Sequence, residues 1–496
     1  MSDLYFKSTR GSNEKVLSSQ AIVNGIAEDG GLYIPEFLPK IGKPLSYLKE
    51  MNYDELAFHI MKKFFTDFED LVLQECIKKA YDSKFGDPAI VPLIEKGGAY
   101  FLELYHGPTL AFKDMALSIL PHLLRAACIK LDIDEEIVIL TATSGDTGKA
   151  ALEGFSDVEG TKIVVFYPRD GVSQIQERQM ITQEGSNTYA IAIEGNFDDA
   201  QKGVKEIFND KNFNKILRNN NYIFSSANSI NIGRLVPQIV YYIYSYLNLS
   251  KLGKISKNER INIVVPTGNF GNILAAYYAK KMGLPVNKLI CASNENNVLY
   301  DFINTGIYDK KRKLKATSSP SMDILVSSNL ERLLYDLCEN DTGVVKSLIE
   351  KLNKRGEYRI TPNMKHKLKD FYGGFATDNE VSETIRDVYK SFNYLIDPHT
   401  AVAYNVYQKY IRDTKDTTKT IIASTASPFK FPNSVMKAVD DKFSNYDDFA
   451  LLEKIAKISN CSIPKSLKDI DKRKILHNTV CKREDMKSII SRILKI

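Results

Sequence analysis

The sequence lacks the residue patterns that mark several large classes of protein. Its six cysteines lie far apart with no Cys-x-x-Cys pair, and its six histidines show no metal-ligand spacing such as His-Glu-x-x-His. Because neither a disulfide framework nor a metal site is indicated, we expect a reduced, cytoplasmic protein that holds no metal ion.

Long apolar runs and charge of a single sign are missing as well. Polar residues interrupt the most apolar stretches well short of a membrane span, and residues 1–15 lack the apolar core of a signal peptide. The net charge is +6, from 67 basic and 61 acidic residues that are spread along the chain. We therefore expect neither a membrane nor a nucleic acid as a partner.

The chain is too long for one compact core, with 496 residues of which 44% are hydrophobic, and no internal repeat divides it. Up to about Lys96, apolar residues recur at helical spacing, which predicts an N-terminal helical domain over residues 1–95. The pattern beyond it predicts a smaller α/β domain over residues 96–235 and a larger one over residues 236–496. A Lys-rich helical cap, more simply explained as a solvated surface than as a binding element, ends the larger domain.

The α/β part of the chain alternates short β-rich runs with helical segments. Strand, loop and helix in repetition predict mostly parallel, doubly wound sheets. Ligands bind such sheets at the carboxyl ends of the strands, so the loops there are the first candidates for a functional site. The predicted strands are residues 136–142, 161–168, 187–193, 261–266 and 419–425.

Lys113 lies in an apolar segment near the start of a predicted helix. A lysine in such a place is usually a surface residue. The functional alternative is a Schiff-base lysine, which must be partly desolvated so that its amine is available near neutral pH. The sequence permits this role without requiring it, because the neighbours Leu110, Ala111, Phe112 and Met115 are apolar.

Two loops rich in glycine follow predicted strands, at residues 143–148 and 267–272. Each opens a helix, where backbone N–H groups can receive a carboxylate or phosphate. The first does not fit a P-loop, because Lys149 is not followed by Ser or Thr, and the second contains no Gly-x-Gly-x-x-Gly. A plain strand-to-helix turn remains the alternative for the first loop.

Two further polar positions are candidates for binding. Arg234 ends a segment of amide and hydroxyl side chains, residues 228–234, and can bind a second anionic group, although a polar helix cap with a surface arginine explains it equally well. Thr425 ends the last predicted strand, where its hydroxyl can hydrogen-bond a ring nitrogen. By itself this is a weak signal.

Together these segments resemble, in order, the threonine synthases of the long bacterial and fungal type. The resemblance covers nearly the whole chain and is specific because nine segments occur in the family's order. They are residues 8–11, 29–35, 106–114, 143–148, 195–201, 228–234, 266–272, 397–404 and 424–428. Asn272, where many relatives have aspartate, Ser427, which replaces a frequent histidine, and residues 232–233 depart from the pattern, but no reactive group is lost.

The resemblance implies an α/β protein of the fold-type II class of pyridoxal-phosphate (PLP) enzymes, related to the tryptophan synthase β chain. It implies that Lys113 is the catalytic residue that carries PLP, and that Thr425 contacts the pyridine nitrogen. The remaining cofactor-binding residues would be Gly268, Asn269, Phe270, Gly271 and Asn272. The substrate-binding residues would be Ser144, Thr147, Asn228, Ser229, Asn231 and Arg234, with Asn269 as a further candidate.

The implied activity is conversion of O-phospho-L-homoserine and water into L-threonine and phosphate, by γ-elimination and β-addition of water. A phospholyase or a hydroxy-amino-acid dehydratase on the same scaffold is the alternative, and a cofactor-free binding protein is another. Family members of this length suggest a monomer, with a dimer as the alternative.

Overall fold

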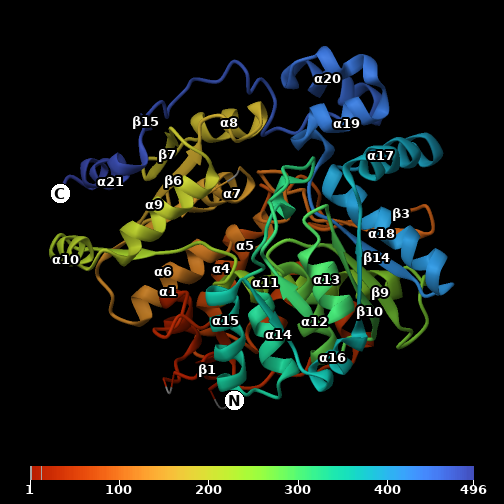
Figure 1. The fold of residues 1–496 in the computed structure, drawn as a ribbon, viewed down its shortest axis with the longest axis horizontal. Coiled ribbons are helices and arrows are strands. Elements are labelled where there is room, and N and C mark those ends of the chain that lie inside the picture. Colours follow the sequence, from red (N-terminus) through yellow and green to blue (C-terminus); the bar gives the residue numbers. More distant parts are fainter. Residues whose placement is uncertain (1–2, 13, 144) are drawn as a thin grey trace.

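The computed structural model describes residues 3–12, 14–143 and 145–496. Two sheets organise it, as Figure 1 shows: a five-stranded sheet with its helices at one end of the molecule, and a six-stranded sheet with its helices at the other. In the part of the chain that is described, no helix is both long and apolar enough to cross a membrane.

The five-stranded sheet is parallel throughout, in the order β15-β7-β6-β5-β8. Its strands are β15 (Val480–Cys481), β7 (Thr188–Ile193), β6 (Thr161–Pro168), β5 (Glu136–Ala142) and β8 (Tyr222–Ser225). Helices of this part are α7 (Asp146–Phe155), α8 (Gln174–Ile181), α9 (Phe197–Asn209), α10 (Lys211–Asn219) and α21 (Met486–Leu494), the last preceded by the short 3-10 helix η5 (Arg483–Asp485).

The six-stranded sheet is parallel except for its edge strand β3, in the order β13-β10-β9-β14-β4-β3. Its strands are β13 (Phe371–Phe375), β10 (Val286–Ser293), β9 (Ile261–Pro266), β14 (Thr420–Ser424), β4 (Ala99–Glu103) and β3 (Leu93–Lys96). Its helices include α12 (Gly271–Met282), α13 (Val298–Thr305), α17 (Asp378–Phe392) and α18 (Pro398–Thr414).

The N-terminal segment packs against helices that lie between the two sheets, with contacts from α1 to α6 and from α3 to α11. It is mostly helical as predicted, but it also contains the antiparallel pair β1 (Phe6–Ser8) and β2 (Tyr33–Pro35). Its helices are α1 (Ser18–Asn24), α2 (Leu45–Leu48), α3 (Tyr53–Met61) and α4 (Asp70–Ala80), and they meet α5 (Asp114–Leu117), α6 (Leu120–Lys130) and α11 (Ile232–Lys251).

Between α13 and β13 the chain forms a further group of strands and helices. It comprises β11 (Ile307–Asp309), η1 (Pro320–Met322), α14 (Leu330–Leu337), α15 (Thr342–Arg355), β12 (Glu357–Arg359), α16 (Pro362–Lys367) and η2 (Leu368–Asp370). After β14 come η3 (Pro428–Lys430), α19 (Pro432–Val439), η4 (Asp441–Asn445) and α20 (Asp448–Ser459). The chain then returns to the five-stranded sheet, held on the way by Arg178 of α8, whose guanidinium donates to the carbonyls of Ile470 (2.9 Å) and Arg473 (3.0 Å).

Strand positions follow the sequence prediction closely where a strand is fully buried. The interior strand β9 is buried at every residue, and β5 and β6 nearly so, which is the continuous apolar pattern of parallel strands covered on both faces. The sheets do not follow the predicted segment boundaries: β4 lies within residues 96–235 but joins the six-stranded sheet, and β15 lies within residues 236–496 but joins the five-stranded one. Sequence order cannot reveal this exchange, because strand pairing is decided by burial across the whole chain.

Candidate active site

The segment that carries Lys113 is fixed to the carboxyl end of strand β14. The N–H of Phe112 donates to the carbonyl of Thr425 (2.8 Å), and the N–H of Ser427 donates to the carbonyl of Leu110 (3.0 Å). Because β4, β9 and β14 are parallel neighbours, the loops that leave their carboxyl ends gather at one edge of the sheet. Thr425, buried at 5% exposure, therefore lies next to the backbone of the lysine's segment.

The Lys113 amine lies inside the protein, with its side chain 12% exposed. Its Nζ donates to the hydroxyl of Ser321 (3.1 Å) and lies 3.6 Å from Oδ2 of Asp146. Burial lowers the pKa of this amine below its usual value, and the Asp146 carboxylate only partly opposes that change. Lys113 thus has the desolvated surroundings that a nucleophilic amine requires.

Asp146 is the central anion of the site and opens helix α7. Gly145 precedes it with φ +133°, a conformation that favours glycine, and a Cβ there would lie 2.5 Å from the side chain of Gln176. That glutamine donates from Nε2 to Oδ1 of Asp146 (2.8 Å), and Ser321 donates to Oδ2 (2.6 Å). Burial alone would raise the pKa of Asp146, but the charges of Lys430 and Lys113 hold it well below its usual range.

The loop between β9 and α12 is shaped by a residue other than glycine in the left-handed region. Phe270 has φ +64° and is buried, which is a strained conformation held by its surroundings. Ser327 donates to the carbonyl of Gly268 (2.7 Å), and the N–H of Asn329 donates to the carbonyl of Asn269 (3.1 Å). Asn269 itself is exposed, at the N-terminus of a twelve-residue helix that begins at Gly271.

Asn272 lies one residue further and turns into the protein. Its amide oxygen accepts hydrogen bonds from the hydroxyls of Tyr241 (2.8 Å) and Tyr242, while its Nδ2 has no partner within the described residues. The tyrosine pair therefore fixes the amide orientation and leaves both N–H donors of Nδ2 without a partner among the described residues.

Arg234 in the first turn of α11 is a buried cation that no carboxylate neutralises among the described residues. Only 2% of it is exposed, its Nη1 donates to the carbonyl of Ala227 (2.8 Å), and its Nε has no hydrogen-bond partner in the described structure. Burial lowers the pKa of this guanidinium to about 10. Its charge also contributes to the lowered pKa of Lys113, so the two groups lie within electrostatic reach of each other. A buried guanidinium with a free donor has the chemistry to pair with an anion.

The other predicted substrate residues are distributed unevenly. Asn231 caps α11, accepting from the N–H of Gly233 (2.8 Å) and donating to the carbonyl of Ile22 (2.9 Å), so its side chain already has two partners. Asn228 is exposed and Thr147 is half-buried in the first turn of α7. Ser229 accepts from Nδ2 of Asn329, which joins the loop before α11 to the loop before α12. Ser144 lies outside the described residues.

Several residues of the site were not predicted from the sequence. Asp146 lies inside the segment 143–148, but only its hydroxyls and glycines had been singled out. Ser321 and Lys430 reach it from distant positions. Behind Ser321, His399 accepts the N–H of that serine at Nε2 (3.2 Å) and bonds Asp397 through Nδ1 (2.6 Å). The segment 397–404 carries this pair, so the motif was a signal, whereas nothing in the sequence singles out Ser321.

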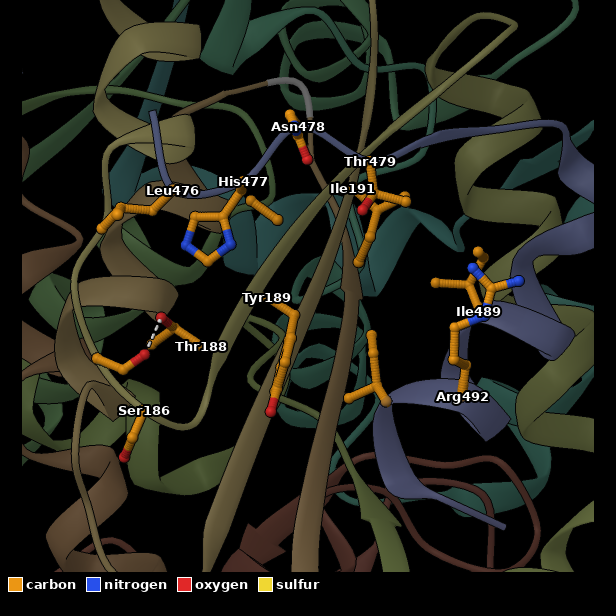
Figure 2. A pocket seen from close by; sticks show the side chains of 13 residues that line it. Ser186, Thr188, Tyr189, Ile191, Leu476, His477, Asn478, Thr479, Ile489 and Arg492 are labelled. Carbon is orange, nitrogen blue, oxygen red and sulfur yellow. Dashed lines mark hydrogen bonds between the residues drawn. The ribbon is translucent and has the colours of Figure 1, made fainter. Parts of the chain in front are cut away.

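A separate cavity of about 300 Å³ lies between β7, the segment before β15 and helix α21. Figure 2 shows Tyr189 and Ile191 of the strand in the middle of the view, with His477 on one side of them and Arg492 on the other. None of its lining residues belongs to the loops around Lys113, so it is not part of the site described above.

Comparisons with known proteins agree along the whole chain. Residues 5–81 match the family model "Threonine synthase N terminus", residues 92–425 match "Pyridoxal-phosphate dependent enzyme", and residues 400–490 match "Threonine synthase, C-terminal". Threonine synthase of Saccharomyces cerevisiae is 36% identical over 500 residues, which cover 94% of this chain and 95% of the yeast protein. The chain belongs to the threonine synthase family.

Two further proteins, one solved structure and one human protein, are similar to this chain. The PLP-bound threonine synthase from Brucella melitensis superposes with a TM-score of 0.88 at 34% identity, over 99% of this chain and all of that one. Human threonine synthase-like 1 is 42% identical over 441 residues, or 86% of this chain, but the chain spans only 58% of that protein's length. The predicted fold-type II class and the predicted cofactor, PLP, are thereby confirmed.

The residues around Lys113 fit this cofactor. A covalent link to PLP requires a desolvated amine, which Lys113 supplies, and the PLP phosphate requires convergent N–H groups, which the N-terminus of α12 supplies. Arg234 also keeps one buried donor, Nε, without a partner among the described residues.

Proposed function

We propose that the protein is a threonine synthase, a carbon–oxygen lyase that converts O-phospho-L-homoserine and water into L-threonine and phosphate. Membership of the threonine synthase family supports this activity. The observation that carries it is the position of Lys113, a buried amine beside Asp146 and within electrostatic reach of the buried and unpartnered Arg234. An amine and a free guanidinium together suit an amino acid that carries a phosphate group.

The cofactor side of the site is assigned as follows. Lys113 would hold PLP covalently, and the hydroxyl of Thr425, at the end of β14, would hydrogen-bond its pyridine nitrogen. The N–H groups of residues 268–272 hold its phosphate, supported from behind by Ser327 and Asn329. A hydroxyl at the ring nitrogen, in place of a carboxylate, would leave the pyridine ring of bound PLP less fully protonated.

The substrate side combines two anion sites. The loop that opens α7, with Ser144 and Thr147, receives the substrate carboxylate at a helix N-terminus. Arg234, with Asn228, Ser229 and Asn269, receives the substrate phosphate. In the described structure Asn231 caps α11, so its part in this site is to orient the backbone that carries Arg234.

PLP, when bound, supplies an electron sink for the carbanions that the reaction forms. With its amine free, Lys113 would take the Cα proton at Nζ and carry protons between the substrate carbons. Ser321 lies within hydrogen-bond distance of this nitrogen and can hold it during the transfer. The phosphate leaves Cγ under the charge of Arg234, and water adds at Cβ.

The test is to incubate the purified protein with PLP and O-phospho-L-homoserine and to measure threonine and phosphate. We expect a visible absorption band that borohydride abolishes, and threonine formed in equal amount to phosphate. A protein that takes up no PLP would refute the assignment, and one that forms only a keto acid would refute the threonine synthase activity while keeping the family.

A phospholyase on the same scaffold is the second candidate. It is favoured by one observation: the relatives at 42% identity are named only threonine synthase-like, whereas the named threonine synthases are 36–40% identical. Such an enzyme would release phosphate from the same substrate without forming threonine, so the product measurement separates the two activities. A hydroxy-amino-acid dehydratase needs no site for a substrate phosphate, and Arg234 speaks against it.

We also propose a cytoplasmic location and a monomeric state, with a small molecule and no nucleic acid as partner. All six cysteines are free, which suits a reducing compartment. Chromatography coupled to light scattering measures the oligomeric state directly.

A further inference from the structure

Lys430 is a buried cation that the proposed reaction does not use. It ends η3, just after strand β14, and none of its surface is exposed. Its Nζ donates to the carbonyl of Thr109 (2.7 Å) and to Oε1 of Gln179 (3.4 Å), and it lies 3.3 Å from Oδ1 of Asp146. A lysine is seldom buried completely, so its charge must have a specific partner there.

Two lysines therefore share a single carboxylate. Lys430 pairs with Oδ1 of Asp146, and Lys113 lies near Oδ2 at the slightly longer distance of 3.6 Å. Each oxygen also accepts one further hydrogen bond, from Gln176 and from Ser321. The carboxylate is thus saturated, and its negative charge is divided between two cations.

No other carboxylate near Lys113 makes an ion pair with its amine among the described residues. Asp114 follows Lys113 directly in the chain, and its carboxylate accepts hydrogen bonds from the N–H and the hydroxyl of Thr109 (2.8 and 2.5 Å). Burial raises the pKa of Asp114 to about 6. Arg234 of α11 adds a further positive charge near Lys113, and His399 of α18, which acts on Asp146, is itself bonded to the buried carboxylate of Asp397 (2.6 Å).

We propose that Lys430 is a positioning residue for Lys113: by sharing the Asp146 carboxylate, it keeps Asp146 from holding the Lys113 ammonium in a closed ion pair and leaves that amine free to bond to the cofactor. The inference rests on the assignment of Lys113 in the proposed function. It assigns Lys430 no contact with substrate, because its amine faces Asp146, Thr109 and Gln179.

The sign of the effect follows from the charges. Lys430 lowers the pKa of the Lys113 amine, and Asp146 raises it. Removing Lys430 therefore stabilises the ammonium form of Lys113, and removing the charge of Asp146 destabilises that form. The two variants must shift the titration of Lys113 in opposite directions, which a merely structural role of Lys430 does not require.

The experiment measures how fast the apo-enzyme forms its visible absorption band with saturating PLP, from pH 6 to pH 10. Lys430→Met should move the midpoint of this profile upward by about one pH unit and slow the reaction about ten-fold at neutral pH. Lys430→Arg should restore the midpoint, and Asp146→Asn should move it downward. If Lys430→Met does not fold, Lys430→Gln replaces it, since its amide can still donate to the carbonyl of Thr109.

Lys149→Met is the matched control, because Lys149 is also buried on α7 but pairs one-to-one with Glu153 (2.9 Å). Its midpoint should remain that of the unchanged protein. A Lys430→Met protein with an unchanged or lowered midpoint would overturn the proposal. Borohydride reduction and peptide mass spectrometry keep the two assignments apart: PLP found on another lysine refutes the role of Lys113 and the inference with it, whereas PLP on Lys113 with an unshifted midpoint refutes the inference alone.

Discussion

Two arginines of this protein are buried to nearly the same degree but differ in how many of their nitrogens have a hydrogen-bond partner. Arg332 of α14 is 1% exposed and Arg234 of α11 is 2% exposed, and burial lowers the pKa of each guanidinium to about 10. Arg332 uses all three of its nitrogens, donating to the carbonyls of Tyr33 (3.0 Å) and Ile230 (2.6 Å) and to the amide oxygen of Asn329. Arg234 makes one such bond and leaves Nε without a partner.

We interpret Arg332 as a residue that stabilises the fold and Arg234 as a residue that binds a ligand. A buried donor without a partner costs free energy, so an arginine left in that state must be matched when a ligand binds. Arg332 joins the N-terminal segment, the loop before α11 and the start of α14, and each of its three nitrogens has a partner. The same contrast holds for the lysines, since Lys149 has its own carboxylate while Lys113 and Lys430 share one.

The largest expected effect is that of Lys113→Ala. Turnover of O-phospho-L-homoserine should fall at least about 1,000-fold, because both the covalent link to PLP and the proton carrier are lost. The visible absorption band should be absent while circular dichroism is unchanged. Retained turnover in this variant would remove Lys113 from the mechanism.

Arg332→Met should destabilise the fold. It leaves two carbonyls and one amide oxygen without their donor, which we expect to lower the free energy of unfolding by about 3 kcal/mol. Denaturant unfolding of the full chain measures this. An unchanged unfolding midpoint would show that Arg332 is as dispensable to the fold as Arg234.

Arg234→Met should lower the activity and leave the stability of the fold intact. The value of kcat/KM for O-phospho-L-homoserine should fall about 100-fold, or about 2.8 kcal/mol, with the stability unchanged or higher, because an unmatched buried charge is removed. Steady-state kinetics and denaturant unfolding on the same preparation check both parts. Loss of stability without loss of activity would reverse the contrast between the two arginines.

Asp146 gives the site a pH dependence of stability. Its pKa in the folded protein is held well below its usual range, so its ion pairs contribute stability above pH 4 that is lost progressively as the pH falls further. The difference in free energy of unfolding between the unchanged protein and Asp146→Asn should therefore shrink by about 1.4 kcal/mol per pH unit below pH 4. A difference that stays constant between pH 7 and pH 3 would contradict the charged state of Asp146.

The sequence predicted much of this site because its polar residues follow strands that are recognisable by themselves. The runs that became β5, β6 and β9 have the predicted ends, β7 and β14 lie within one residue of theirs, and the glycine-rich loops directly follow β5 and β9. Ser321, Asn329 and Lys430 escaped prediction because each reaches the site across a long stretch of chain, from short segments without a distinctive composition. Whether the guanidinium of Arg234 finds hydrogen-bond partners likewise depends on tertiary packing, which a local sequence pattern cannot predict.

The most direct test of the account follows the oxygen atoms of the reaction. In ¹⁸O-labelled water, elimination of phosphate from Cγ and addition of water at Cβ place one labelled oxygen on the hydroxyl of threonine, and the released phosphate stays unlabelled. Mass spectrometry of both products should show this pattern with the unchanged protein and no product with Lys113→Ala. Label in the phosphate together with homoserine as the product would mean hydrolysis of the phosphate ester, and would contradict the role given to Lys113 and its cofactor.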